Sequence, residues 1–314
     1  MKDKKYFSIS IIIPTYNASK YLSALLQRIK ESILKEKTEI LIIDSSSTDN
    51  TIEIARSFNT KIITIPKHKF DHGGTRTNAG KIAKGEILIY LTQDALPSDK
   101  YAIRNLIIPF YKDEKISVTF GRQLPHSDAT PFAKHLRIFN YPDKSYVRSL
   151  QDKERYGLKT CFCSNSFAAY RKSALEKIGW FKNGLIVSED SYAVAKMILK
   201  GYKVAYVSEA MVYHSHNYTL FQEVKRYFDI GVFHRNEKWI KDIFGCATKQ
   251  GKKYVISELK FLLRNHYYHL VPEFVIRNFF KYLGYKLGYN YRLLPLKLIK
   301  RLSFHTDWWQ NKKF

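Results

Sequence analysis

The stretch "SISIIIPTYN", residues 8–17, begins with an apolar, largely β-branched run and ends in a proline followed by polar side chains. A continuous apolar run of this length is typical of a strand that is buried on both faces of a parallel sheet. In the next segment, residues 19–36, leucines and isoleucines recur at helical spacing. The beginning of the chain therefore predicts a buried strand followed by an amphipathic helix.

The same alternation continues along the chain. Apolar runs predict three further strands, over residues 39–44, 61–66 and 86–95, and helices are expected over residues 47–58 and 75–85. Strands that alternate with helices predict an α/β fold, with a mostly parallel sheet and right-handed crossovers. Strands and a helix complete this domain up to residue 220, and the pattern from 221 to 314 is mostly helical. We therefore expect two parts, 1–220 and 221–314.

Polar clusters follow the predicted strands: "PTYN" (14–17), "DSSSTD" (44–49), "DHGGTR" (71–76) and "TQDA" (92–95). In parallel sheets, ligands bind beyond the carboxyl ends of the strands, so these clusters indicate an active site there. The first cluster lacks the G-x-G-x-x-G pattern of dinucleotide-binding enzymes, and no Walker lysine motif is present. These two classes are therefore excluded.

Taken in order, the motifs resemble those of the inverting glycosyltransferases of family 2, which have the GT-A fold, over about residues 8–218. The resemblance implies a nucleotide-sugar donor and a divalent metal, Mg²⁺ or Mn²⁺, that bridges its two phosphates. "FDHGGTR" (70–76) and the pair Gln93-Asp94 resemble the rhamnosyltransferase branch of the family. That branch implies dTDP-β-L-rhamnose as the donor.

The resemblance also assigns donor-binding residues. Asp44 resembles the carboxylate that accepts a hydrogen bond from the pyrimidine ring, and Asp49 resembles one that positions the nucleotide, although either could be a helix cap. Gly73 and Gly74 would let backbone N–H groups approach the diphosphate, to which Arg76 would donate charge-assisted hydrogen bonds. The full predicted set is Pro14, Thr15, Tyr16, Asn17, Asp44, Ser46, Asp49, His72, Gly73, Gly74, Arg76, Asn78 and Gln93.

The metal ligands implied by the resemblance are Asp94 and a late histidine. Family members carry two acids where this chain has Gln93 and Asp94, but a Mg²⁺ site can use one carboxylate plus substrate phosphates. His214 and His216 share one face of an extended segment, and either could contact the metal or the diphosphate. His214 is our first choice.

The catalytic base implied by the resemblance is Asp190, with Glu189 in support. An inverting transfer needs a base that takes the proton from the acceptor hydroxyl. Two acids at the start of a helix could also simply interact favourably with the helix dipole. Asn165 and Trp180 resemble residues in the walls around the acceptor and donor sugars.

The charge of the chain indicates an anionic partner. There are 53 Lys and Arg against 28 Asp and Glu, a net charge of +25. Residues 221–314 carry 19 of these basic residues and seven acidic ones, interleaved with aromatic side chains. Such a segment could bind single-stranded nucleic acid, remain a solvated basic face, or dock on an anionic membrane. We expect the membrane and no nucleic acid, because the enzyme-like motifs need none.

The sequence thus predicts a rhamnosyltransferase of surface-polysaccharide synthesis (O-antigen, capsule or cell wall), acting on a polyprenyl-diphosphate-linked glycan. Three cysteines make no disulfide framework, and no apolar run reaches the length of a membrane span. We therefore expect a cytoplasmic protein, peripheral on the inner face of the cell membrane. The alternatives are a UDP-hexose transferase, or a non-catalytic nucleic-acid- or lipid-binding protein on a transferase fold. The oligomeric state is left open.

Overall fold

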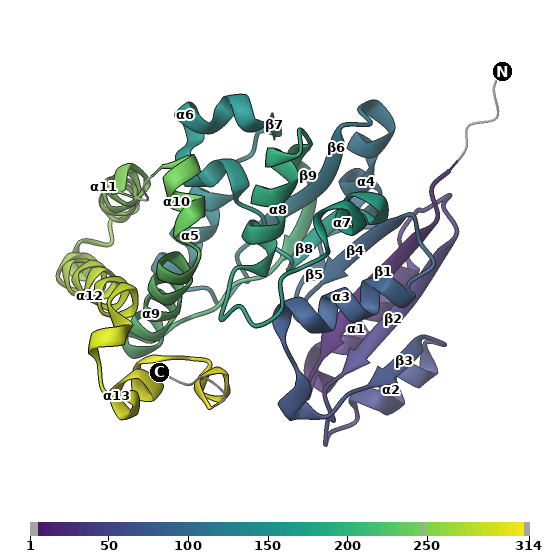
Figure 1. Cartoon of the computed structure of the whole chain (residues 1–314), viewed down its shortest axis with the longest axis horizontal. Helices are drawn as coiled ribbons and strands as arrows, with labels where there is room; N and C mark the ends of the chain where they lie inside the picture. The colour runs from purple at the N-terminus through teal and green to yellow at the C-terminus, as the bar shows by residue number, and fades with distance from the viewer. Residues whose placement is uncertain (1–5, 246–247, 311–314) are drawn as a thin grey trace.

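The computed structural model describes residues 6–245 and 248–310. Their strands form one mixed sheet of nine strands, in the order β3-β2-β1-β4-β8-β6-β9-β5, with β7 paired to β9 (Figure 1). The strands are β1 Ile9–Thr15, β2 Thr38–Asp44, β3 Lys61–Thr64, β4 Ile87–Leu91, β5 Leu96–Pro97, β6 Ile116–Leu124, β7 Tyr146–Arg148, β8 Phe167–Arg171 and β9 Lys203–Tyr213.

The helices cover both faces of this sheet and continue beyond it. They are α1 Ser19–Lys30, α2 Thr51–Ser57, α3 His72–Ile82, α4 Ala102–Lys112, α5 Pro131–Asn140, α6 Lys153–Tyr156, α7 Lys172–Ile178, α8 Glu189–Leu199, α9 Leu220–Asn236, α10 Lys238–Phe244, α11 Thr248–Arg264, α12 Val271–Tyr289 and α13 Leu296–Leu302. None of the described helices is both long and apolar enough to cross a membrane.

The first half of the sheet has the parallel arrangement that the sequence predicts. Strand β1 lies between β2 and β4, and both pairings are parallel. Strand β8 then runs antiparallel between β4 and β6, so the sheet is mixed rather than fully parallel. Within β1, Ile11 and Ile13 face one core, with α1 and α4, whereas Ile12 faces the other, with α3 and α8. The alternation of a strand thus buries the whole apolar run.

The C-terminal helices pack against the domain and against each other. The backbones of α9 and α12 meet closely, because a Cβ atom on Gly288 would lie 2.0 Å from the Phe228 carbonyl oxygen. Phe228 and Trp309 belong to the same buried cluster as Tyr90 of the sheet. Helix α9 begins where the sequence predicts a change to helical structure, but the hydrophobic core continues across that point. The predicted α/β fold with a helical C-terminal region is confirmed.

Candidate active site

The loops after β1 and β2 are joined by hydrogen bonds at the carboxyl edge of the sheet. Asn17 accepts a hydrogen bond from the Thr48 N–H (2.9 Å), and Asp49 accepts from the N–H groups of Ser19 and Thr51 (3.1 Å each). Burial opposes ionisation of Asp49, but these bonds prevail and lower its pKa to about 2. Asp49 is therefore a fixed anion that holds the two loops together; it precedes Asn50, the N-cap of α2, and its contact with the nucleotide stays a prediction.

Asp44 lies at the end of β2 and is fully buried. Its carboxylate accepts hydrogen bonds from the Thr15 hydroxyl (2.9 Å) and the Ser47 N–H (2.8 Å). Ser46 has a left-handed backbone (φ 58°), and its hydroxyl donates to the Ile65 carbonyl. The contact of Asp44 with a pyrimidine ring stays a prediction.

The side chain of Gln93 forms two hydrogen bonds with the backbone of the loop that follows β1. Its side-chain oxygen accepts from the Tyr16 N–H (2.9 Å) and its amide nitrogen donates to the Tyr16 carbonyl (3.2 Å). The exposed Tyr16 ring lies 4.3 Å from Lys67 Nζ. These two hydrogen bonds therefore connect the β1 loop to the segment that carries Asp94, the residue after Gln93.

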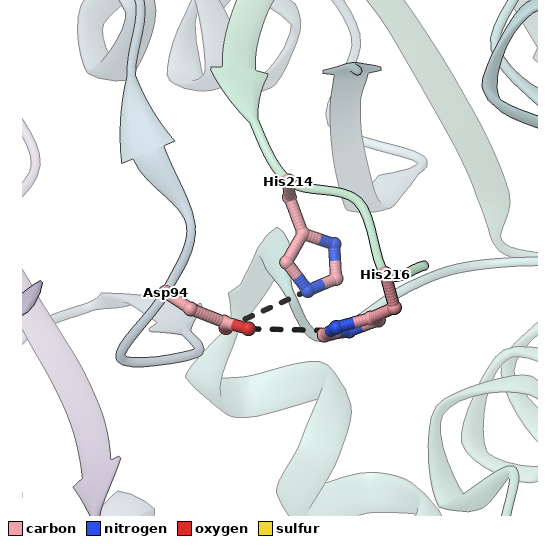
Figure 2. Close-up of side chains that lie close together, drawn as sticks. All are labelled: Asp94, His214 and His216. Atoms are coloured by element: carbon pink, nitrogen blue, oxygen red, sulfur yellow. Dashed lines mark ion pairs between the residues drawn. The ribbon is translucent and has the colours of Figure 1, made fainter. Parts of the chain in front are cut away.

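Asp94, His214 and His216 form a cluster that could hold a metal ion. Asp94 follows β4, and both histidines follow β9 (Figure 2). Their ligand atoms all lie within 4.8 Å of one another, with His214 Nε2 3.5 Å from Asp94 Oδ1 and His216 Nε2 3.9 Å from Oδ2. One carboxylate and two imidazoles, all directed to one point, fit a divalent metal. All three predicted metal residues are brought together.

Hydrogen bonds behind the cluster fix the tautomer of His214. The Gln123 side-chain oxygen accepts from Arg137 Nη1 (2.6 Å), and its amide nitrogen lies 2.9 Å from the Ser164 hydroxyl. Because a guanidinium can only donate, the orientation of the amide is determined. His214 Nδ1, 2.9 Å from the same oxygen, must carry a proton, and the Nε2 lone pair therefore faces Asp94.

The ionisation state of His214 agrees with that arrangement. Burial lowers the pKa of His214 to about 3, despite the opposing charge of Asp94. The imidazole is therefore neutral near pH 7, which is the form that binds metals.

Asp190 occupies the first turn of α8. Its carboxylate accepts hydrogen bonds from the N–H groups of Asn165 (3.1 Å) and Ser191 (2.6 Å). Burial, with the neighbouring charge of Glu189, raises the pKa of Asp190 to about 7. A pKa near the working pH is the most effective for a general base, so the environment of Asp190 suits the role predicted for it.

Glu189 and Arg76 form a buried salt bridge, with Arg76 Nη1 3.2 Å from Glu189 Oε1. Burial opposes ionisation of Glu189, but the guanidinium keeps its pKa below the usual value. Arg76 is only 4% exposed and also donates to the His72 carbonyl. The guanidinium thus compensates a buried carboxylate through Nη1, and the contact of Arg76 with the diphosphate stays a prediction.

Gly73 and Gly74 lie inside the first turn of α3, which begins earlier than the predicted helix over residues 75–85. The helix starts at His72 because Asp71 caps it by accepting from the Gly74 N–H. A Cβ atom on Gly73 would lie 2.1 Å from the Lys182 carbonyl oxygen. Gly73 therefore makes room for the segment at Lys182, and the approach of the two glycine N–H groups to a diphosphate stays a prediction.

The remaining predicted residues lie at varied positions. Pro14 is part of β1, and Asn78 is exposed on α3. Asn165 is buried beside the two acids of α8 and donates to Glu189. Trp180 has a left-handed backbone (φ 68°) and a half-buried ring that contacts α3 at Gly80. Their contacts with donor or acceptor stay predictions.

Sequence reasoning did not anticipate that part of the C-terminal region lies beside the predicted site residues. The His305 ring lies 5.3 Å from the His72 ring. Arg226, an exposed residue of α9, lies 6.0 Å from the Tyr218 ring, which in turn lies 5.4 Å from His216. No motif distinguishes Arg226 or His305; in the sequence both are only members of the basic, aromatic segment 221–314.

Comparison with known families and proteins gives long matches. The family model "Glycosyl transferase family 2" matches residues 10–179, and "Glycosyl transferase family group 2" matches residues 98–309. The chain is 44% identical to the O-antigen chain rhamnosyltransferase RfbN of Salmonella typhimurium, over 98% of this chain and 97% of that one. It is 42% identical to the O-antigen chain rhamnosyltransferase WbaN of Salmonella anatum, with the same coverage.

Solved structures with the same fold have much lower identity. A mannosyltransferase from Pyrobaculum calidifontis, in complex with GDP-Man and Mn²⁺, has a TM-score of 0.61 at 15% identity and covers 98% of this chain and 89% of its own. Staphylococcus aureus TarS 1–349 with UDP-GlcNAc has a TM-score of 0.54 at 16% identity, covering 91% and 92%. These likenesses concern the fold, and they agree with the GT-A fold predicted from the sequence.

Proposed function

The chain belongs to glycosyl transferase family 2, and from that premise we propose that it transfers L-rhamnose from dTDP-β-L-rhamnose to a hydroxyl of a lipid-linked glycan in surface-polysaccharide synthesis. The observation that carries the choice of sugar is the 44% identity, over 98% of the chain, to an O-antigen chain rhamnosyltransferase. The site geometry supports the chemistry, because a carboxylate of raised pKa and a cluster of metal-ligand type lie at the same edge of one sheet.

The reaction is a single in-line displacement with inversion at the anomeric carbon. Asp190 takes the proton of the acceptor hydroxyl while its oxygen forms a bond to that carbon. The bond from the anomeric carbon to the diphosphate oxygen breaks, and its electron pair leaves with the nucleoside diphosphate. Glu189 does not take the proton in this scheme, because its salt bridge to Arg76 lowers its pKa and makes it the weaker base.

Asp94 and His214, with His216, would hold the divalent metal, which would neutralise charge on the leaving diphosphate. Mg²⁺ prefers oxygen ligands, whereas imidazole suits transition metals better. Two histidines beside one carboxylate therefore favour Mn²⁺ over Mg²⁺ in this chain.

For the diphosphate itself we assign Arg226 in place of Arg76. Arg76 is buried in its salt bridge, whereas Arg226 is exposed on α9, near His216 and His305. A guanidinium on that side of the cluster would donate charge-assisted hydrogen bonds to phosphate oxygens. The C-terminal region would then contribute to donor binding as well as to packing.

The surface of α12 supports the proposed acceptor and location. Val275, Phe279 and Tyr282 lie along one face of this helix and are each between 58% and 61% exposed. An exposed apolar stripe on a region with 19 basic and seven acidic residues fits an anionic membrane surface. We therefore place the protein as a peripheral protein on the cytoplasmic side, where a polyprenyl-diphosphate-linked acceptor would meet the site.

A donor screen tests this proposal. Purified protein with Mn²⁺ is offered dTDP-rhamnose, UDP-glucose and UDP-N-acetylglucosamine in turn, with a lipid fraction from the cells as acceptor, and released nucleoside diphosphate is measured. We expect the fastest release from dTDP-rhamnose. Faster release from a UDP-hexose would favour the alternative donor class and overturn the assignment of the sugar.

A further inference from the structure

A groove of about 550 Å³ lies between α5 and α11 and shares no lining residue with the candidate active site. Its α11 wall is one helical stripe, formed by residues at intervals of three and four: Lys253, Ile256, Ser257, Lys260 and Arg264. His135 and Ile138 of α5 line the opposite wall. The volume is in the range of small-molecule sites, about 300 to 1,000 Å³.

The groove is strongly cationic. Lys253, Lys260 and Arg264 are all exposed, and no carboxylate is among the lining residues. The positive field extends to Lys159, whose pKa is lowered to about 8 by burial and by the charges of Arg148 and Lys253. Such a groove favours a negatively charged ligand.

The groove is also apolar along part of its length. Ile138 and Ile256 are 53% and 55% exposed, and they face the groove from opposite walls. The ring of Phe261 adds a partly buried apolar surface. Cations beside exposed aliphatic side chains fit a ligand that has both an anionic group and hydrocarbon, rather than a simple inorganic ion.

We propose that this groove binds the phosphate headgroup of an anionic membrane phospholipid, with the lipid chains against Ile138 and Ile256. The inference rests on the proposed membrane association and assigns it a specific site. Lys253, Lys260 and Arg264 would surround the phosphate, and α11 would lie against the bilayer surface. Charge complementarity is the reason for choosing a lipid over a second copy of this chain, whose net charge of +25 would repel another copy.

The test compares two neighbouring lysines of α11. Lys253 lines the groove and Lys252 does not, although both are exposed and a charge reversal changes the net charge equally. The variants Lys253→Glu and Lys252→Glu are sedimented with phosphatidylcholine vesicles, with and without phosphatidylglycerol. One basic residue near an anionic surface contributes about 1 kcal/mol, roughly five-fold in affinity.

We expect Lys253→Glu to bind phosphatidylglycerol vesicles at least about ten-fold more weakly, because the reversal removes one attraction and adds one repulsion. Lys252→Glu should lose less than about three-fold. Equal losses in the two variants would mean that binding depends on the diffuse field of the region, and the specific site would be refuted.

A second neighbouring pair tests the apolar part. Ile256→Ser should weaken vesicle binding, whereas Val255→Ser, at a position outside the groove lining, should not. Thermal unfolding of each variant checks that the fold is intact. Unchanged binding by Ile256→Ser would overturn the placement of the lipid chains.

Competition separates the possible ligands. Short-chain, water-soluble phosphatidylglycerol should displace the protein from vesicles, and inorganic phosphate at the same concentration should not. Equal displacement by both would indicate a simple anion site, and a dimer in light scattering that Lys253→Glu dissociates would indicate a second copy. Either result overturns the proposal. Donor hydrolysis by Lys253→Glu should equal that of the wild type, so a failure here is distinguishable from a failure of the proposed function.

Discussion

Replacing Asp190 by asparagine tests both the catalytic role and the electrostatics of the site. Asparagine keeps the shape of the protonated carboxyl group but can neither ionise nor accept a proton. In the folded protein the pKa of Asp190 is raised to about 7, chiefly by burial, whereas an unfolded aspartate titrates near 3.9. The folded wild type therefore binds the proton more tightly than the unfolded chain does.

The sign and size of the stability effect follow from this difference. Because the native state holds the extra proton, the wild type loses stability as the pH rises from about 4 to about 7. Each unit is worth about 1.36 kcal/mol, so the two units from pH 5 to pH 7 correspond to roughly 3 kcal/mol. Asp190→Asn should escape this loss, and its stability relative to the wild type should increase by that order between pH 5 and pH 8.

The assay combines urea unfolding at pH 5 and pH 8 with turnover at pH 8. We expect Asp190→Asn to lose about 10² to 10⁴-fold in turnover, the usual contribution of a general base, while gaining relative stability. Wild-type activity should fall as the pH drops below about 7. The same pH dependence of stability in both proteins would refute the raised pKa. A variant with more than about a tenth of wild-type turnover would refute the role of Asp190 as base.

Three further predictions concern the metal cluster and the diphosphate. Asp94→Asn should weaken Mn²⁺ binding, measured by the electron paramagnetic resonance signal of free Mn²⁺, and excess chelator should abolish wild-type turnover; full activity in chelator would contradict the metal assignment. Gln123→Leu removes the acceptor that fixes the His214 tautomer, so Mn²⁺ affinity should fall about 10 to 100-fold, and an unchanged affinity would show that this hydrogen bond does not position the ligand. Arg226→Ala should weaken binding of dTDP more than that of dTMP in calorimetry, whereas the neighbouring Lys225→Ala should change neither; equal loss for both nucleotides would remove Arg226 from the diphosphate site.

The fold and part of the candidate site were predictable from the sequence because both depend on local patterns. The run Ile11–Ile13 is apolar at every position, and such a run reads as a strand buried on both faces. Asp94, His214 and His216 follow strands that lie in one sheet, so their convergence follows from the rule that sites lie at carboxyl ends. The apolar pattern and the positions of the strand ends therefore predict where much of the site lies.

Contacts between distant segments were not predictable in this way. Arg76 reads as a free cation in the sequence, and only the fold brings Glu189 to it across more than a hundred residues. The reason for Gly73 is likewise the carbonyl of Lys182, a neighbour that no local pattern reveals. Tertiary packing thus determines what these residues contact, whereas the motif is recognisable from the sequence alone.

The C-terminal region shows the same limit on a larger scale. Its basic, aromatic composition indicates a surface function, but Phe228 and Trp309 are buried in the core of the domain. Composition describes what a segment contains and does not say which of its faces is covered. The glycines of α9 and α12 lie where the two backbones meet. The close helix–helix contact explains these glycines, but only once the structure is known.

The most direct test of the central claim is the anomeric configuration of the product. The protein is incubated with dTDP-β-L-rhamnose, Mn²⁺ and the lipid-linked acceptor, and the new linkage is read from the one-bond carbon–proton coupling at the rhamnose anomeric carbon. A single displacement assisted by Asp190 predicts an α-L-rhamnoside. A β-L-rhamnoside would mean retention, and no rhamnose in the product would mean a different donor; either result would contradict the account.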